Sequence, residues 1–315
     1  MLKCLGTLAA AVLAVVLTTA GAAADEPAAL RIGYQKTGIL IVARNQHVIE
    51  DKLAGRGIPV QWIEFSSGPP LLEAMNAGSL DIGLTGDTPP IFAQAAGAAI
   101  TYVAALAPNG PGEGIVVKAD SPIRTVADLK GKRVGVKKGS SAQNLLVAAL
   151  AKAGVPWTDI TPLDLSPADA AAAFDRDSID AWAIWDPFFA VAQERYAPRV
   201  LATTDEVLDA NTFLLANPTF AGQHADVLRD AVAALTQAAA WADANKSAVA
   251  AAVQAETKVD LAALERAAGR ASFYVRPLDD GIIANQQQTA DRFYALGLLP
   301  KPIVVRDAVW RPSQS

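Results

Sequence analysis

The sequence predicts an α/β fold in two lobes, each a mainly parallel sheet flanked by helices. From residue 30 onward, short apolar runs alternate with helix-like segments, which is typical of parallel sheets. Two further extended stretches, 114–118 and 212–216, fall outside this alternation and bracket its last two units. The chain has 315 residues, 52% of them hydrophobic, which is enough for a sizeable core and for one or two lobes.

Five strand-to-helix junctions share one pattern, in which an apolar strand runs into small polar residues, often a proline, and then a helix. The predicted strands are 30–34, 60–65, 80–84, 133–136 and 180–185, and the helices that follow them are 39–53, 69–76, 91–96, 142–153 and 188–196. Beyond residue 223 the chain is rich in alanine, and it predicts one or two helices over 224–255 and another over 261–272. We interpret these alanines as closely packed helix surface.

The two extra extended stretches predict the division into lobes. If the chain crosses between lobes at both of them, lobe I comprises residues 25–109 plus 212–315, and lobe II comprises residues 110–211. A cluster of proline and glycine at 108–112 favours a boundary at the first crossing.

The first 24 residues are typical of an export signal. Lys3 precedes an apolar run over 8–17, and small residues lead to Ala24, where we expect cleavage. The run is too short to span a bilayer, so the alternative of a retained membrane anchor is less favoured. Cys4 lies before the run, so the mature chain has no cysteine. We therefore expect an exported protein that is not inserted in the membrane after the signal is removed.

Composition disfavours several classes of function. The formal net charge is −5, so the chain has no basic excess for nucleic acid. His47 and His224 are the only histidines, far apart in sequence, and neither a phosphate-binding loop nor a Gly-x-Ser-x-Gly motif occurs. We expect no cofactor, no metal site and no enzymatic activity.

The strand-to-helix junctions instead favour a small anion. In open parallel sheets the carboxyl ends of the strands form the ligand crevice, where helix starts present unpaired N–H groups. The best candidate is 137–144, where glycine allows close backbone approach and Ser140 and Ser141 carry hydroxyls. The alternative is that Ser140 only caps its helix.

Other junction residues have two interpretations each. Asp186 is best explained as a helix cap. Asp87 could accept hydrogen bonds that fix its loop, or it could face a cationic group on a zwitterionic ligand. Trp185, at a strand end, could contact a ligand tail, whereas Trp182 is more simply part of the core.

Several stretches resemble the periplasmic aliphatic sulfonate-binding proteins of ABC importers, within the wider nitrate, sulfonate and taurine binding group. The resemblance covers nearly all of the mature chain and is carried by 30–36, 79–98, 125–131, 138–141, 144–146, 180–187 and 286–291.

The resemblance implies a type II periplasmic binding protein, a monomer whose two lobes close over an alkanesulfonate in the cleft between them. It implies delivery of the ligand to a membrane permease driven by an ATPase. By similarity, the ligand-binding residues are Gln35, Gly86, Asp87, Thr88, Ser140, Ser141, Asn144, Trp185 and Asp186.

Other ligands remain open within this class: taurine, nitrate, sulfate esters or a thiamine-precursor pyrimidine. From other classes, pyrimidine-precursor synthases of similar fold use a cysteine-rich site, which the cysteine-free mature chain cannot form. The effector domain of a transcription regulator is disfavoured by the export signal and by the lack of a helix-turn-helix segment.

Overall fold

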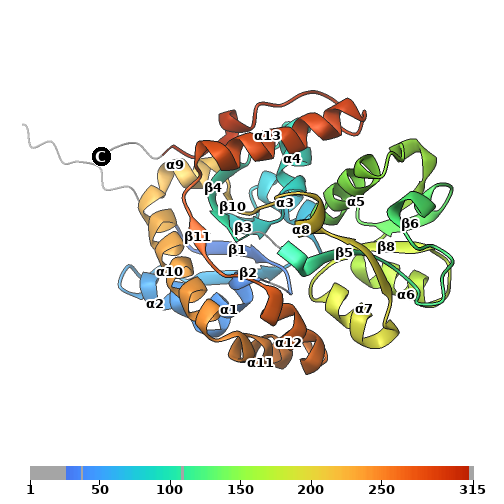
Figure 1. The fold of residues 1–315 in the computed structure, drawn as a ribbon. Coiled ribbons are helices and arrows are strands. Elements are labelled where there is room, and N and C mark those ends of the chain that lie inside the picture. Colours follow the sequence, from blue (N-terminus) through green and yellow to red (C-terminus); the bar gives the residue numbers. More distant parts are fainter. Residues whose placement is uncertain (1–25, 37, 108–109, 312–315) are drawn as a thin grey trace, which may run out of the picture.

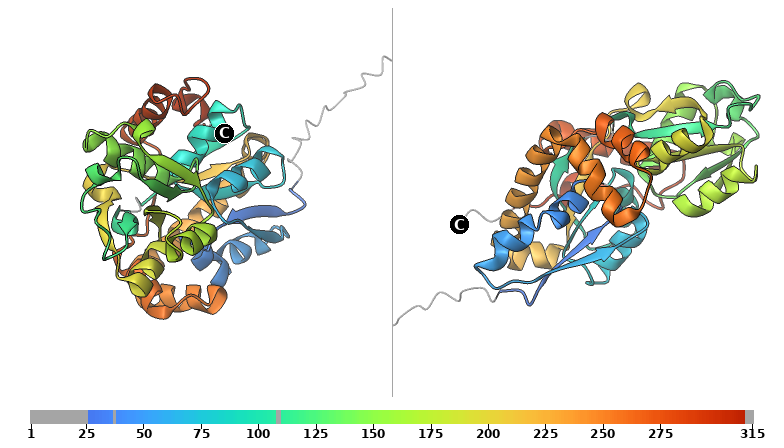
Figure 2. Two further views of the ribbon diagram at one scale, coloured as in Figure 1. Left: turned by 90° about the vertical axis from the view of Figure 1, so that its right-hand side faces the viewer. Right: turned by 90° about the horizontal axis from the view of Figure 1, so that it is seen from below.

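The structure is a computed structural model that describes residues 26–36, 38–107 and 110–311. Two lobes lie side by side, one built from the blue and orange parts of the chain and the other from the green and yellow parts (Figures 1 and 2). The expected signal peptide, residues 1–24, lies outside the described residues. Within the described part, no helix combines the length and the apolar character needed to cross a bilayer.

Lobe I contains a mixed sheet with the strand order β11-β4-β10-β3-β1-β2. Its strands are β1 (Leu30–Tyr34), β2 (Val60–Glu64), β3 (Ile82–Thr85), β4 (Thr101–Leu106), β10 (Thr212–Ala216) and β11 (Val275–Arg276). β1 pairs in parallel with β2 and β3, while β10 runs antiparallel to both β3 and β4. Alternate residues of β10 enter the cores on opposite faces: Leu214 on one face and Phe213 on the other.

Lobe II contains a second mixed sheet, with the order β7-β6-β8-β5-β9. Its strands are β5 (Glu113–Val117), β6 (Arg133–Val136), β7 (Thr161–Asp164), β8 (Ala181–Trp185) and β9 (Arg199–Thr203). β6 pairs in parallel with β7 and β8, and β5 runs antiparallel to β8 and β9. The two extended stretches that stood outside the alternation are therefore β5 and β10, the antiparallel strands that follow the two connections between sheets.

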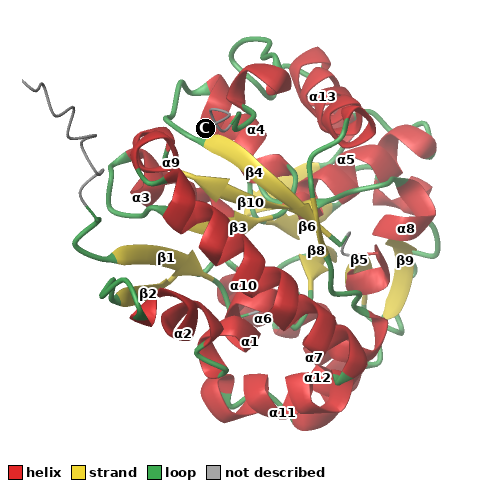
Figure 3. Cartoon of the chain, turned by 90° about the vertical axis from the view of Figure 1, so that its left-hand side faces the viewer, coloured by secondary structure: helices red, strands yellow, loops and turns green. Residues whose placement is uncertain are grey.

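Helices cover both faces of the lobe I sheet (Figure 3). One face packs against α1 (Ile39–Asn45), α2 (Val48–Ala54), α10 (Ala225–Ala244) and α11 (Lys246–Thr257), and the other against α3 (Gly68–Asn76), α4 (Thr88–Ala95) and α13 (Asp280–Ala295). The remaining helices are α5 (Ser141–Lys152), α6 (Pro167–Asp175), α7 (Phe188–Tyr196), α8 (Thr204–Val207), α9 (Pro218–Gln223) and α12 (Leu261–Arg270).

One predicted helix is two helices in the structure. The segment predicted as 39–53 breaks between α1 and α2, where His47 adopts a left-handed conformation with φ 54°. Histidine is among the residues that tolerate this region of backbone space, so the chain can turn there without glycine. The alanine-rich segment after residue 223 forms α10 and α11, followed by α12, as predicted.

Candidate ligand-binding cleft

A cleft with a volume of about 180 Å³ lies between the two lobes. Its lining includes residues at the starts of helices from both lobes: Gly68 of α3 and Pro89 of α4 from lobe I, with Ser141 of α5 and Pro187, just before α7, from lobe II. The partial positive charge of helix N-termini therefore converges on the cleft from two sides.

Six of the nine residues predicted to bind a ligand line this cleft: Gln35, Gly86, Ser140, Ser141, Trp185 and Asp186. The other three, Asp87, Thr88 and Asn144, are buried and do not line it. Their contact with a ligand stays a prediction that the geometry does not favour. Trp182 is packed in the lobe II core, whereas Trp185 lines the cleft with 8% of its surface exposed.

The start of α5 presents backbone donors. The Ser140 hydroxyl donates to the carbonyl of Lys137 (2.7 Å) and accepts from the N–H of Gln143 (3.4 Å), so this side chain does cap the helix. The Ser141 hydroxyl donates to Oε1 of the buried Glu113 (2.5 Å). Both hydroxyl protons are directed into lobe II. Because the cap takes up the Gln143 N–H, the donors left for an anion are the N–H groups of Ser141 and Ala142, which have no acceptor within the helix.

The turn between β3 and α4 touches this helix start from lobe I. A Cβ placed on Gly86 would lie 2.8 Å from Cβ of Ser141, so only glycine permits this approach of the two lobes. Prolines follow at Pro89 and Pro90, as they do at the start of α3, and proline has no N–H to offer. The helices α3 and α4 of lobe I therefore contribute the positive ends of their dipoles but few N–H donors. Most of the backbone N–H donors come from α5.

Behind the cleft, Asp87 belongs to a buried network that joins the lobes. Its carboxylate accepts from the Thr88 hydroxyl (2.8 Å) and from Nδ2 of Asn144 (2.6 Å). Nη1 of Arg292 on α13 donates to Oδ1 of Asn144 (2.8 Å), and Nε2 of Gln286 donates to the Asp87 carbonyl (2.6 Å). Burial raises the pKa of Asp87, and the bonds from Thr88 and Asn144 oppose that rise. Of the two interpretations of Asp87 from the sequence, these contacts match a carboxylate that accepts hydrogen bonds and fixes its loop. They do not match a carboxylate that faces a cationic group of a ligand.

Asp186, which lines the cleft, combines a capping contact with an ion pair. Its Oδ1 accepts from the N–H of Ala190 in the first turn of α7 (3.1 Å), which is the capping role that the sequence predicts. Nε of Arg270 on α12 donates to Oδ2 (2.6 Å). Burial raises the pKa of Asp186, and the contacts with Arg270 oppose that rise. Because Arg270 supplies the opposite charge, this carboxylate repels an anion less than a bare one would.

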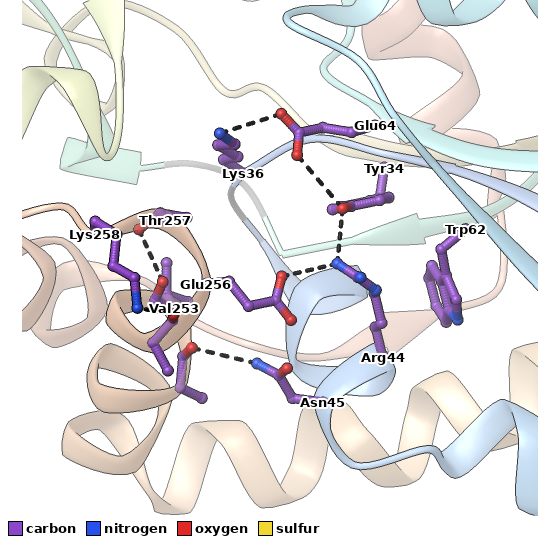
Figure 4. Close-up of polar contacts among 12 residues, drawn as sticks. Tyr34, Lys36, Arg44, Asn45, Trp62, Glu64, Val253, Glu256, Thr257 and Lys258 are labelled. Carbon is purple, nitrogen blue, oxygen red and sulfur yellow. Dashed lines mark hydrogen bonds and ion pairs between the residues drawn. The ribbon is translucent and has the colours of Figure 1, made fainter.

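Sequence reasoning missed Arg270 and Lys36. Lys36 lines the cleft, and its Nζ lies 3.3 Å from Oε1 of Glu64 (Figure 4). The same view shows Arg44 donating to the hydroxyl of Tyr34 (2.7 Å) and to Glu256 (2.9 Å), which joins α1 to α11. Lys36 could have been found from its place directly after a strand end. Arg270 could not, because nothing in its alanine-rich helix indicates contact with α7.

Comparisons with known proteins show the family of this chain. The NMT1/THI5-like family model matches residues 53–248. An aliphatic sulfonates-binding protein of Escherichia coli (strain K12) is 41% identical over 319 residues, covering 98% of this chain and 96% of the relative.

Two solved structures are similar over nearly the whole fold. The alkanesulfonate-binding protein from Xanthomonas axonopodis pv. citri, bound to MOPS, has a TM-score of 0.86 at 42% identity and covers 91% of this chain and 100% of that one. The periplasmic aliphatic sulphonate binding protein from Escherichia coli has a TM-score of 0.83 at 39% identity, covering 92% and 94%. The chain therefore belongs to the NMT1/THI5-like family and to its group of aliphatic sulfonate-binding proteins.

Proposed function

We propose that this protein captures an aliphatic sulfonate in the cleft between its lobes and delivers it to an ABC importer. The observation that carries the proposal is the contact of the α5 start with the Gly86 turn at the cleft. At this contact, the backbone N–H groups at the start of α5 in lobe II face the cleft, and the positive ends of helix dipoles from both lobes point toward the same part of it. A sulfonate fits this arrangement because its three oxygens accept several hydrogen bonds while its carbon tail can occupy apolar surroundings.

The binding residues follow from their positions. We assign the anionic head group to the α5 start, with Gln35 and Gly86 completing the surroundings from lobe I and Trp185 from lobe II. Asp186 is a positioning residue that acts through Arg270. Asp87, Thr88 and Asn144 hold the two helix starts in place from behind, and they act without touching the ligand.

Capture works through closure of the lobes rather than through covalent chemistry. The connections between β4 and β5 and between β9 and β10, where the predicted boundaries after residues 109 and 211 fall, serve as the hinge. A ligand that contacts both lobes stabilises the closed form, because it gains both sets of contacts only there. The protein is exported to the periplasm as a monomer, and its signal is cleaved near Ala24. There the closed form docks on a membrane permease, and the ATPase of the importer drives uptake of the ligand.

Binding measured by calorimetry tests this function. The mature chain, residues 25–315, is freed of bound ligand by unfolding and refolding and is titrated with butanesulfonate, taurine, nitrate, sulfate and an aminopyrimidine. We expect micromolar or tighter binding of butanesulfonate and little heat from nitrate or sulfate. Binding of taurine, nitrate or the pyrimidine in place of butanesulfonate would contradict the proposed ligand.

Two serine variants test the location of the head group. Ser140 and Ser166 both cap helices of lobe II, but only Ser140 lines the cleft. Each change to alanine removes a cap and should cost about 1 kcal/mol of stability. Ser140→Ala should also weaken butanesulfonate binding about tenfold, equivalent to ~1.4 kcal/mol, because it loosens the turn that presents the donors. Equal affinities for Ser140→Ala and Ser166→Ala would contradict this location.

A further inference from the structure

The cleft continues into lobe I as an apolar space between four helices. Side chains from α1, α10, α11 and α12 line it, and each is between 1% and 6% exposed. They are Leu40, Ala239, Ala250, Val253, Leu264 and Ala268. All six belong to the same core cluster of lobe I, yet they border open volume rather than filling it. We call this space the tail chamber.

We propose that the tail chamber takes up the hydrocarbon tail of a linear alkylsulfonate, so that the protein prefers tails long enough to enter it. This inference rests on the proposed function and names the substrate class within it. The six side chains that define the chamber carry no polar atom, so a water molecule there would lack partners. Empty apolar cavities of this kind stay dry and bind apolar molecules.

Small residues create the space. Three of the six lining residues are alanines, one each from α10, α11 and α12. Protein interiors are normally packed without voids, so a cavity at this point leaves dispersion contacts unmade. A methylene chain from a ligand supplies those contacts. The alanine-rich composition of these helices thus provides ligand volume in addition to the close helix packing that the sequence predicts.

Polar contacts on the outside keep the chamber walls in place. Nη1 of Arg44 on α1 contacts Glu256 of α11 (2.9 Å), and Nδ2 of Asn45 donates to the carbonyl of Ala252 (3.3 Å) (Figure 4). These contacts tie α11 to α1 and hold the wall away from the void. The ligand then spans both lobes, with its head at α5 and its tail in lobe I.

The chamber predicts a dependence on tail length that an anion site alone would not produce. Each methylene buried from water contributes ~0.8 kcal/mol, which is about a fourfold gain in affinity. We therefore expect affinity for the unbranched ethane-, butane-, hexane- and octanesulfonates to rise about fourfold per methylene until the chamber is full. If ethanesulfonate binds and the longer sulfonates bind no more tightly, the proposal of a tail chamber is overturned. The proposed function would remain intact, because a sulfonate would still bind.

Variants on α11 locate the tail. Ala250→Leu fills the chamber and should lower octanesulfonate affinity at least tenfold relative to ethanesulfonate. Ala251→Leu adds the same group to the exposed face of the same helix and should leave the ratio unchanged. An unchanged ratio in a folded Ala250→Leu protein, as judged by its ethanesulfonate binding, would overturn the proposal.

A second variant keeps the test decisive if Ala250→Leu does not fold. Val253→Ala enlarges the chamber, so the tail length of highest affinity should shift to a longer sulfonate than in the wild type. An unshifted optimum would count against the chamber. If the wild type binds none of the sulfonates, the proposed function and this inference fail together.

Discussion

Arg270 and Asp186 form a two-point ion pair across the cleft, from α12 of lobe I to the strand end before α7 of lobe II. Nε of Arg270 lies 2.6 Å from Oδ2, Nη2 lies 2.5 Å from Oδ1, and the two side chains are only 16% and 15% exposed. The guanidinium also stacks over the ring of Phe189, 4.4 Å from its centroid, and donates to Oε1 of Gln193 (2.9 Å). The pair therefore joins the lobes where they meet beside α7.

Removing this arginine should favour the open form. Arg270→Ala leaves the carboxylate of Asp186 in a mostly buried position without its charged partner. Breaking a buried ion pair in this way costs about 3 kcal/mol of stability. Opening the cleft rehydrates the carboxylate and relieves that cost. We expect a larger radius of gyration by small-angle X-ray scattering without ligand, and weaker sulfonate binding.

The control lies one turn away on the same helix. Arg266 pairs with Glu194 of α7, but these side chains are 50% and 35% exposed. Arg266→Ala should cost at most about 1 kcal/mol and leave the scattering unchanged. Equal scattering from Arg270→Ala and Arg266→Ala would show that the Arg270–Asp186 pair does not hold the lobes together.

Gly86→Ala should prevent full closure. The added methyl group would lie 2.8 Å from Cβ of Ser141, a distance that requires the lobes to separate. We expect at least a tenfold loss of sulfonate affinity in calorimetry, with little change in melting temperature, because the clash is relieved by a rigid movement of the lobes. Gly222→Ala, a helical position with no atom within 4 Å of the new Cβ, is the matched control and should bind as the wild type does.

Asp87 should make stability fall as the pH rises. Burial raises its pKa above the value of about 3.9 in an unfolded chain, so the folded protein keeps this proton to higher pH. Its contribution to stability is fully present below about pH 4 and is lost as the pH rises through the raised pKa.

The comparison with Asp87→Asn isolates this effect. Asparagine does not titrate, so the free energy of unfolding of the wild type should fall relative to the variant as the pH rises, by up to ~1.4 kcal/mol per pH unit. Urea titrations across pH 4 to 8 would measure it. Asp120→Asn removes an exposed carboxylate and is the control for charge alone. A constant difference between wild type and Asp87→Asn would argue that the carboxylate is ionised throughout.

Trp185 should affect ethane- and octanesulfonate alike. It lines the cleft from lobe II, whereas the tail chamber lies in lobe I. Trp185→Ala should therefore lower both affinities by a similar factor, measured with the same calorimetric series. A loss of affinity confined to octanesulfonate would place the tail against the indole. That result would match the expectation from the sequence that Trp185 contacts a ligand tail.

The sequence by itself determined the local structure of this protein. Apolar runs ended by small residues and prolines placed β1, β2, β3, β6 and β8 and the helices that follow them, since strand and helix starts depend on nearby side chains. The strand-to-helix junctions also singled out Ser140, Ser141 and Trp185, and the family resemblance added Gln35 and Gly86; all five line the cleft. The length of the predicted helix 39–53 was wrong, because a turn at His47 needs only one residue in the left-handed region.

Only the tertiary structure decided which of these residues meet. Asp87 and Asn144 face each other behind the cleft, although both follow strand ends that the sequence treats like the others. Arg270 reaches Asp186 across 84 positions of chain, and the alanines of α10, α11 and α12 border a common space. The physical reason is that the direction of a side chain and the packing of distant helices depend on the whole fold, whereas helix and strand starts depend on their immediate neighbours.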